Sequence, residues 1–263
     1  MSGVDAATAG APRLRPASAR AQAPAGDGSR VAVEAFSRGD AIDRDWMGWG
    51  ALRVLSRQDW APGATRDDGR VANMERLLLV LDGALDADCG DLGRHRVEAG
   101  GALWIGTGHG LESRLANASA RRPLRLVEFW LRPDRVNAAP AVAAWLPDGG
   151  PGARDDGVAG AWRPLAGVLP AGQRVAAMVA RLGPGECSAI PHGAGHRRWL
   201  EVLSGGVVAA AGEARAHAGP PAGGLRLAEG DGLGWLAGAT GAPATVAAFD
   251  DVPAWVLLLA LPD

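Results

Sequence analysis

The stretch that decides the fold is Asn73-Met74-Glu75-Arg76-Leu77-Leu78-Leu79-Val80-Leu81-Asp82-Gly83. Its centre, Leu77–Leu81, is a continuous apolar run. A short apolar run bounded by a turn signal is typical of a buried strand, and glycine is the residue most free to adopt the φ values of a tight turn. The stretch is therefore predicted to be a buried strand that ends in a glycine turn at Gly83.

The same pattern recurs in the second half of the chain, where Glu201-Val202-Leu203-Ser204-Gly205 matches residues 79–83. Three more pairs keep the same order and a nearly constant offset: Pro62-Gly63 with Pro184-Gly185, Ala99–Leu103 with Glu229–Leu233, and Leu124–Leu131 with Ala254–Leu261. Four matches in order indicate an internal duplication. The sequence therefore predicts two copies of one β-barrel.

Short apolar runs between Gly and Pro residues recur along the chain, and no long stretch has the 3.6-residue period of a helix. Many short strands with such punctuation favour an all-β sandwich or barrel. The expected strands are Ala51–Leu55, Leu77–Leu81, Ala102–Ile105, Leu124–Leu131, Ala176–Leu182, Trp199–Leu203, Gly206–Ala210, Leu225–Leu227, Leu233–Leu236 and Ala254–Leu261.

Composition divides the chain into a tail, two domains and a linker. Residues 1–30 are rich in Ala, Arg and Pro and lack the apolar core of a signal peptide, so we expect a flexible tail. Gly, Pro and Asp crowd residues 148–161, as in an inter-domain linker. The two barrels are then expected at residues 31–147 and 162–263.

Charge and cysteine content exclude several classes of protein. The formal net charge is -2 and the isoelectric point is about 6.2, so there is no basic field to attract a nucleic acid. No apolar run is long enough to span a membrane. The two cysteines, Cys89 and Cys187, are far apart and form no C-x-x-C motif. This usage fits a reducing compartment, and we expect a cytoplasmic protein.

An ordered set of motifs resembles the pirin family of bicupins, and its bacterial quercetinase-like branch most of all. The resemblance spans residues 31–263 and implies two tandem cupin (jelly-roll) β-barrels with one metal, usually iron, in the N-terminal barrel. Some members of the family are dioxygenases that act on flavonols such as quercetin, and others are regulatory binding partners. The motifs are Trp46–Val54, Met74-Glu75, Leu81–Gly83, Gly106–Gly108, Leu124–Pro133, Arg197–Val202 and Asp231–Leu233.

The metal site of the family consists of two histidines on one strand, then a histidine and a glutamate on a later strand. Such a set binds Fe(II) and leaves positions open for substrate and oxygen. The resemblance places these four ligands at Gly69, Val71, Leu111 and Ser113, so the ligand motif is degenerate. Glu112 is one residue away, but strand alternation predicts that it points to the opposite face.

Other residues near these positions are candidates for a site. His109 and Glu112 are the residual candidates for a rearranged metal site, to which Asp67 and Asp68 can add oxygen ligands. The family arrangement also places aromatic and acidic side chains near the cavity of the N-terminal barrel, where they can line a pocket for a flat aromatic molecule. These are Trp46, Trp49, Glu75 and Trp104.

The remaining histidines and cysteine suggest no site. His192 and His196 flank a Gly-Ala-Gly loop and are interpreted as a surface pair. His95 and His217 lie in expected turns and are interpreted as solvated. Cys187 follows a turn with no base predicted beside it, which gives no support for a nucleophile.

Three functions fit this sequence, and whether the protein is an enzyme is left open. The preferred hypothesis is a metal-free pirin-like protein without a cofactor, which binds an aromatic small molecule or a protein partner without catalysis. The alternative is a divergent iron-dependent dioxygenase, similar to quercetin 2,3-dioxygenase, with a site rearranged around His109 and Glu112. The third is a structural subunit whose partner keeps the metal. Nucleic acid and membrane are not expected partners.

Overall fold

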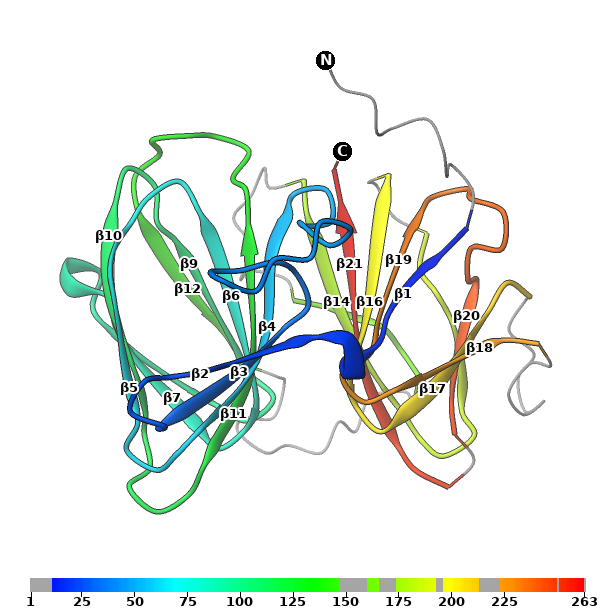
Figure 1. The fold of residues 1–263 in the computed structure, drawn as a ribbon, viewed down its shortest axis with the longest axis horizontal. Helices are drawn as coiled ribbons and strands as arrows, with labels where there is room; N and C mark the ends of the chain where they lie inside the picture. The colour runs from blue at the N-terminus through cyan, green and yellow to red at the C-terminus, as the bar shows by residue number, and fades with distance from the viewer. Residues whose placement is uncertain are drawn as a thin grey trace. The chain divides into compact units, whose positions relative to one another are not determined.

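The computed structural model describes residues 11–146, 160–165, 174–192, 196–212, 223–249 and 251–262, which form 21 strands and two short 3-10 helices (Figure 1). The chain divides into two compact units. The N-terminal barrel contains residues 20–146 and Leu165, and the C-terminal barrel contains residues 11–19, 160–164 and those from Arg174 onward. Each unit has one large and one small antiparallel sheet. The all-β fold of two tandem cupin barrels is therefore confirmed.

The large sheet of the N-terminal barrel has the strand order β12-β9-β6-β11-β4-β3-β2, and the small sheet has the order β5-β10-β7-β8. Helix η2 (Gly90–Leu92) lies between β7 and β8. The strands are β2 (Ala21–Pro24), β3 (Arg30–Glu34), β4 (Leu52–Trp60), β5 (Thr65–Val71), β6 (Glu75–Asp82), β7 (Ala84–Asp88), β8 (Arg94–Glu98), β9 (Ala102–Gly106), β10 (Leu111–Asn117), β11 (Leu124–Leu131) and β12 (Ala141–Trp145).

The large sheet of the C-terminal barrel has the order β1-β19-β16-β21-β14-β13, and the small sheet has the order β15-β20-β17-β18. Helix η1 (Ala17–Ala19) follows β1. The strands are β1 (Arg13–Arg15), β13 (Arg163–Pro164), β14 (Ala176–Leu182), β15 (Cys187–Ala189), β16 (Arg197–Ser204), β17 (Gly206–Ala210), β18 (Leu225–Ala228), β19 (Gly232–Leu236), β20 (Thr245–Ala248) and β21 (Ala254–Leu261).

The two strand orders repeat each other, because β9-β6-β11-β4 matches β19-β16-β21-β14 and β5-β10-β7-β8 matches β15-β20-β17-β18. The turn glycines repeat as well. Gly83 and Gly205 both have positive φ, at 81° and 74°. A Cβ at Gly83 would meet the Pro123 carbonyl oxygen at 2.6 Å, and one at Gly205 would meet the Pro253 carbonyl oxygen. Both turns therefore require glycine, and the predicted duplication extends to individual backbone contacts.

The N-terminal segment differs from the expected flexible tail. Residues 13–15 form β1, which pairs with β19 from Arg13 opposite Gly234 to Arg15 opposite Gly232. Residues 21–24 form β2, which pairs with β3 in the other barrel. Both strands are short and polar, so they lack the apolar pattern by which a strand is detected. Residues 148–159 of the expected linker lie outside the described residues.

Across the described ranges, no helix is long and apolar enough for a membrane span.

Candidate functional site

The interior of the N-terminal barrel changes character along its strands. Leu78 and Val80 of β6 and Leu124 and Leu126 of β11 belong to the apolar core. Side chains two residues apart on a strand share a face, so the same interior face continues at Arg76 on β6 and Glu128 on β11. Both are fully buried. One end of the barrel is therefore apolar, and the other end holds buried charges.

Arg76 is held by three acceptors from three other strands. Its Nε and Nη2 atoms donate to Glu128 Oε1 at 3.0 and 2.7 Å. Nη2 also donates to Asp68 Oδ2 at 2.8 Å, and Nη1 donates to Ser113 Oγ at 3.0 Å. The guanidinium carbon lies 4.9 Å from the ring centre of Trp130. The guanidinium is thus fixed on its edge by carboxylates and on its face by an indole.

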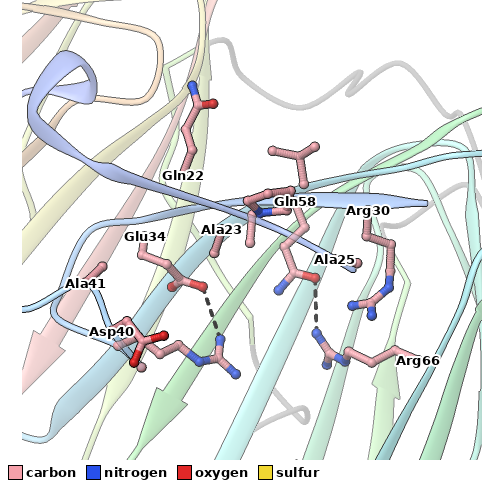
Figure 2. Close-up of a pocket in the computed structure, with 14 residues that line it drawn as sticks. Gln22, Ala23, Ala25, Arg30, Glu34, Asp40, Ala41, Gln58 and Arg66 are labelled. Carbon is pink, nitrogen blue, oxygen red and sulfur yellow. Dashed lines mark hydrogen bonds and ion pairs between the residues drawn. The ribbon is translucent and has the colours of Figure 1, made fainter. Parts of the chain in front are cut away.

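Arg66 of β5 contacts the same two carboxylates, Glu128 and Asp68. Its Nη1 and Nη2 atoms donate to Glu128 Oε2 and Oε1 at 2.8 and 2.9 Å, and its Nε lies 2.7 Å from Asp68 Oδ1. Gln58 donates to Glu128 Oε2 at 2.8 Å. It also accepts from Arg66 Nη1 at 3.1 Å (Figure 2). We call Arg66, Asp68, Arg76, Ser113 and Glu128 the arginine–carboxylate cluster.

The cluster is balanced in charge, with two guanidinium groups and two carboxylates. Burial opposes ionisation of Glu128, but the charges of Arg66 and Arg76 outweigh it and hold the pKa of this carboxyl well below its usual range. Burial likewise opposes the charge of Arg66, yet Glu128 and Asp68 raise the pKa of that guanidinium. The cluster is therefore an internally neutral set of ions that stays charged at neutral pH.

Of the four positions that the resemblance assigned to metal ligands, Ser113 belongs to this cluster, and the other three are on the same strands, β5 and β10. Gly69 is exposed, and its φ of 60° is one that histidine rarely adopts. Val71 and Leu111 are direct partners in the ladder between β5 and β10 and have no ligand atoms. Ser113 is buried, and its hydroxyl accepts from Arg76. These residues do not fit a transition metal, because three lack a donor atom and the fourth contacts a cation.

The residual candidates for a metal site lie at the surface. His109 and Glu112 are both exposed, and Glu112 is on the face of β10 opposite the buried Ser113. The backbone carbonyl of His109 accepts from Arg70 Nη2 at 3.2 Å. Within the described parts of the chain, no group of three or more His, Cys, Asp and Glu side chains is arranged to hold a metal ion. Asp68 is in the cluster, whereas Asp67 accepts from the Gly69 amide at 3.2 Å.

The tryptophans expected to line a pocket are buried. Trp46, Trp49 and Trp104 are 8%, 7% and 5% exposed. Trp104 Nε1 donates to Glu75 Oε2 at 2.7 Å, so these two side chains come together as neighbours on β9 and β6. None of the four lines the pocket of about 640 Å³ beside β2 and β3 that is described below. Their role in binding stays a prediction.

Sequence reasoning missed Arg66, Arg76 and Glu128 as site residues. One signal was present, because Glu128 is a charged residue within the apolar strand β11. Its partners lie 62 and 52 positions away, and only the strand pairing brings them together. A single sequence does not reveal that pairing.

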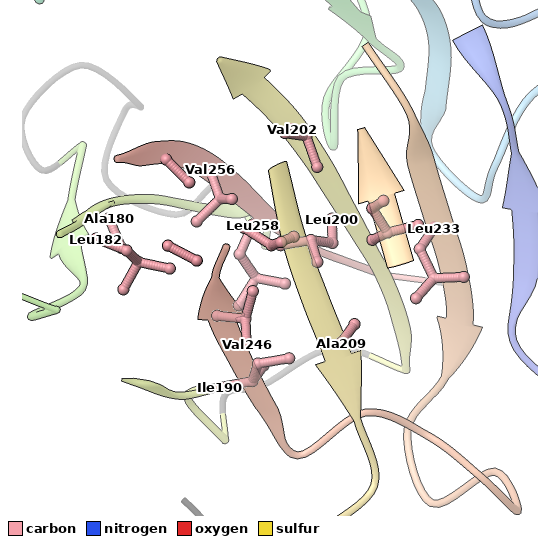
Figure 3. Packing of buried hydrophobic residues seen from close by; sticks show 14 of the residues in the cluster. Ala180, Leu182, Ile190, Leu200, Val202, Ala209, Leu233, Val246, Val256 and Leu258 are labelled. Carbon is pink, nitrogen blue, oxygen red and sulfur yellow. The ribbon is translucent and has the colours of Figure 1, made fainter. Parts of the chain in front are cut away.

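The interior of the C-terminal barrel is apolar where the N-terminal barrel is charged (Figure 3). Ile190, Leu200 and Leu258 belong to one buried cluster. His192 and His196, at the end of this barrel's strands, are exposed. Burial raises the pKa of the Cys187 thiol, which disfavours the thiolate that a nucleophile needs. His217 lies outside the described residues, and His95 contacts the Leu92 carbonyl at 3.0 Å.

Comparison with known proteins relates this chain to pirins. No family model matches it. The pirin-like protein YhaK of Escherichia coli (strain K12) is 31% identical over 104 residues, which are 39% of this chain and 45% of YhaK. The match therefore spans less than half of that relative.

Solved structures extend the likeness in fold to almost the whole chain. YhhW from Escherichia coli has a TM-score of 0.75 at 23% identity and covers 96% of this chain and 98% of its own. The bacterial pirin YhhW in complex with nickel(II) has a TM-score of 0.73 at 22% identity, covering 96% and 99%. Quercetin 2,3-dioxygenase from Acinetobacter baumannii has a TM-score of 0.66 at 15% identity, covering 95% and 79%. At these identities the structures establish the fold alone.

Proposed function

We propose that this chain is a pirin-type bicupin that acts as a non-catalytic binding protein, in which a guanidinium replaces the metal centre; the likeness to YhaK in sequence and to YhhW in fold supports the family. One observation carries the proposal. The side chain of Arg76 lies inside the N-terminal barrel against Ser113, the position that the resemblance assigns to the carboxylate ligand. The cation of the family is then supplied by the protein itself, and Glu128 and Asp68 neutralise it.

A divalent ion beside Arg76 would be unfavourable. Arg76 and Arg66 already bring two positive charges to the two carboxylates of the cluster, and a further cation would be repelled in a medium of low dielectric constant. Restoring one ligand would not restore the site. The backbone at Gly69 has the wrong conformation for a strand histidine, and each lost ligand lowers metal affinity. These points support binding without redox chemistry.

The alternative function is a divergent metal-dependent dioxygenase. Its support is the likeness in fold to a nickel-bound pirin and to a quercetin 2,3-dioxygenase. His109 and Glu112 would have to supply the metal ligands. Both are exposed, so a metal there would face solvent rather than the enclosed interior in which oxygen chemistry is protected.

Metal analysis of protein purified without chelators separates the two functions. We expect iron, nickel and zinc well below one ion per chain and quercetin consumption at the buffer rate. The variants His109→Ala and Glu112→Ala should leave both values unchanged, as should the control His95→Ala. A stoichiometric metal that disappears in His109→Ala or Glu112→Ala but remains in His95→Ala would overturn the proposal.

Thermal shift measurements separate a binding protein from a purely structural subunit. A molecule that binds the folded state raises the melting temperature in proportion to the logarithm of its excess over Kd. We expect such a shift with at least one class of small aromatic molecule. A melting temperature that responds to no small molecule, but rises with a co-purifying protein subunit, would favour the structural role.

A further inference from the structure

A pocket of about 640 Å³ opens on the N-terminal barrel beside the arginine–carboxylate cluster (Figure 2). Its walls come from β2, β3 and the loop after β3, and its floor includes Gln58 and Arg66 of the barrel interior. A volume of this size suits a small organic molecule. Small apolar residues form much of the wall, and they are Ala23, Pro24, Ala25, Val31, Ala32 and Ala41.

Arg30 of β3 stands at one end of this pocket. Its guanidinium carbon lies 5.1 Å from the ring centre of Trp60, and that of Arg66 lies 5.6 Å from the same ring. Figure 2 shows the two head groups on the same side of the pocket, with Asp40 at the other end. The positive charges of Arg30 and Arg66 thus share one buried indole.

The positive charge of Arg30 is not matched by a carboxylate. Within the described residues its side chain makes no hydrogen bond or ion pair, and its Nε is buried without a partner. Asp27, whose charge acts on Arg30, is exposed and accepts instead from the Ser29 amide and hydroxyl at 2.9 and 2.7 Å. Burial, and then the charge of Arg66, lower the pKa of Arg30, but a guanidinium stays protonated.

The other arginines of the pocket are already paired. Arg66 is neutralised by Glu128 and Asp68. Arg38 pairs with Glu34 at 3.2 Å, and its guanidinium lies over Trp130. Among the three, Arg30 alone therefore keeps its terminal Nη1 and Nη2 donors without a carboxylate partner. A guanidinium presents these donors in a planar fork that matches the two oxygens of a carboxylate.

We propose that this pocket binds a small organic molecule through a carboxylate that pairs with Arg30. The apolar wall of the pocket covers the body of the ligand, and the ring of Trp60 stabilises the guanidinium of Arg30. This inference rests on the proposed binding role and adds the chemical class of the ligand to it. It does not need a metal, because Arg30, the residue proposed to bind the carboxylate, takes no part in the cluster around Arg76.

Calorimetric titration with benzoate tests the proposal, with octanoate as a second carboxylate and benzamide as the neutral match of benzoate. We expect at least one carboxylate to bind, benzoate to bind at least ten-fold more tightly than benzamide, and added salt to weaken binding. Arg30→Gln should lower the affinity at least ten-fold, whereas the control Arg94→Gln, at an exposed arginine on β8, should not change it. Arg30→Lys keeps the charge without the fork and should be intermediate.

Three outcomes would overturn the proposal. They are absence of binding for both carboxylates, equal affinity for benzoate and benzamide, and binding to Arg30→Gln that equals the wild type. Inorganic phosphate that binds while the carboxylates do not would reject the carboxylate class. Circular dichroism checks whether Arg30→Gln is folded. If it is not, the affinity of Arg30→Lys for benzoate decides, and an affinity equal to that of the wild type would overturn the proposal.

Metal content measured on the same samples separates this inference from the proposed function. Carboxylate binding that persists with excess EDTA, in a protein that also carries a stoichiometric metal, would defeat the metal-free function and keep the ligand class. A metal-free protein that binds benzamide and benzoate with equal affinity would defeat the carboxylate class and keep the metal-free function.

Discussion

The two barrels of this protein carry an arginine at the same place in the fold but surround it differently. Counting back from the turn glycines Gly83 and Gly205, Arg76 on β6 corresponds to Arg198 on β16. Counting forward from the prolines that contact these glycines, Glu128 on β11 corresponds to Leu258 on β21. In the N-terminal barrel Arg76 pairs with the buried carboxylate of Glu128, whereas in the C-terminal barrel the corresponding position holds Leu258.

Asp68, the second carboxylate of the cluster, is also replaced. Aligned on Pro62-Gly63 and Pro184-Gly185, Asp68 corresponds to Ile190, which belongs to the apolar core of the C-terminal barrel. Burial alone lowers the pKa of Arg198, whereas carboxylates surround Arg76. The duplicated fold thus places Arg76 against Glu128 and Asp68 next to a pocket, whereas the positions of these two carboxylates hold Leu258 and Ile190 in the C-terminal barrel. Function is expected where the charges are kept.

The largest effect is expected from making the N-terminal barrel resemble its copy. Glu128→Leu leaves Arg76 and Arg66 with Asp68 as their one shared carboxylate, so two buried guanidinium groups lose the fully buried partner that they have in common. Removal of one member of a buried ion pair costs about 3–5 kcal/mol of unfolding free energy. Urea denaturation measures the loss, and the double variant Glu128→Leu/Arg76→Leu should recover part of it. A loss below about 1 kcal/mol would show that the cluster is not the buried network described.

The matching change in the C-terminal barrel removes packing rather than charge. Leu258→Ala should cost about 2–5 kcal/mol, because Leu258 is fully buried and the neighbouring strands cannot close the cavity completely. The loss should be the same at low and high salt, unlike that of a charged position. A salt-dependent loss would contradict an apolar interior in this barrel.

The turn glycines test what the duplication preserves. Gly83→Ala and Gly205→Ala each place a Cβ against a proline carbonyl at a positive φ, and strain of this kind costs about 1–3 kcal/mol. We expect similar losses for both. Gly63→Ala is the control, because its φ of 69° is also positive but its Cβ would meet open space. If the losses at the two turns are no larger than the loss at Gly63, the contact with the proline carbonyl does not explain why these turns need glycine.

Acid should reduce the difference between the wild type and Glu128→Leu. The folded-state pKa of Glu128 is lowered, so its contribution is fully present above the unfolded pKa, about 4.3 for glutamate, and is lost as pH falls below that value. The difference in unfolding free energy should therefore shrink below pH 4.3, by at most about 1.4 kcal/mol per pH unit. Urea titrations at several pH values measure it. A difference that grows on acidification would have the wrong sign.

Patterns in the sequence revealed the apolar parts of this fold better than its polar parts. All ten expected strands are present, because each has an apolar run or alternation that barrel packing preserves. Strands β5 and β10 were missed, since Thr65–Val71 and Leu111–Asn117 are dominated by polar residues. These strands supply Arg66, Asp68 and Ser113. The site was therefore hidden for a physical reason, because ions that compensate one another across strands leave no hydrophobic period along any one strand.

The smallest effect expected concerns reactivity, not stability, and again contrasts the barrels. Cys89 is fully buried in the core of the N-terminal barrel, and burial raises its pKa to about 11. Cys187 on β15 is only partly buried, and burial raises its pKa as well. At pH 8 about one Cys89 in a thousand is a thiolate, and that sulfur is also enclosed. We expect a disulfide reagent to label Cys187 slowly in the folded protein and Cys89 only after unfolding. Cys187→Ser should then abolish labelling of the folded protein. If that variant still reacts at the wild-type rate, the thiol of Cys89 is accessible, and the core of the N-terminal barrel opens far more often than its packing implies.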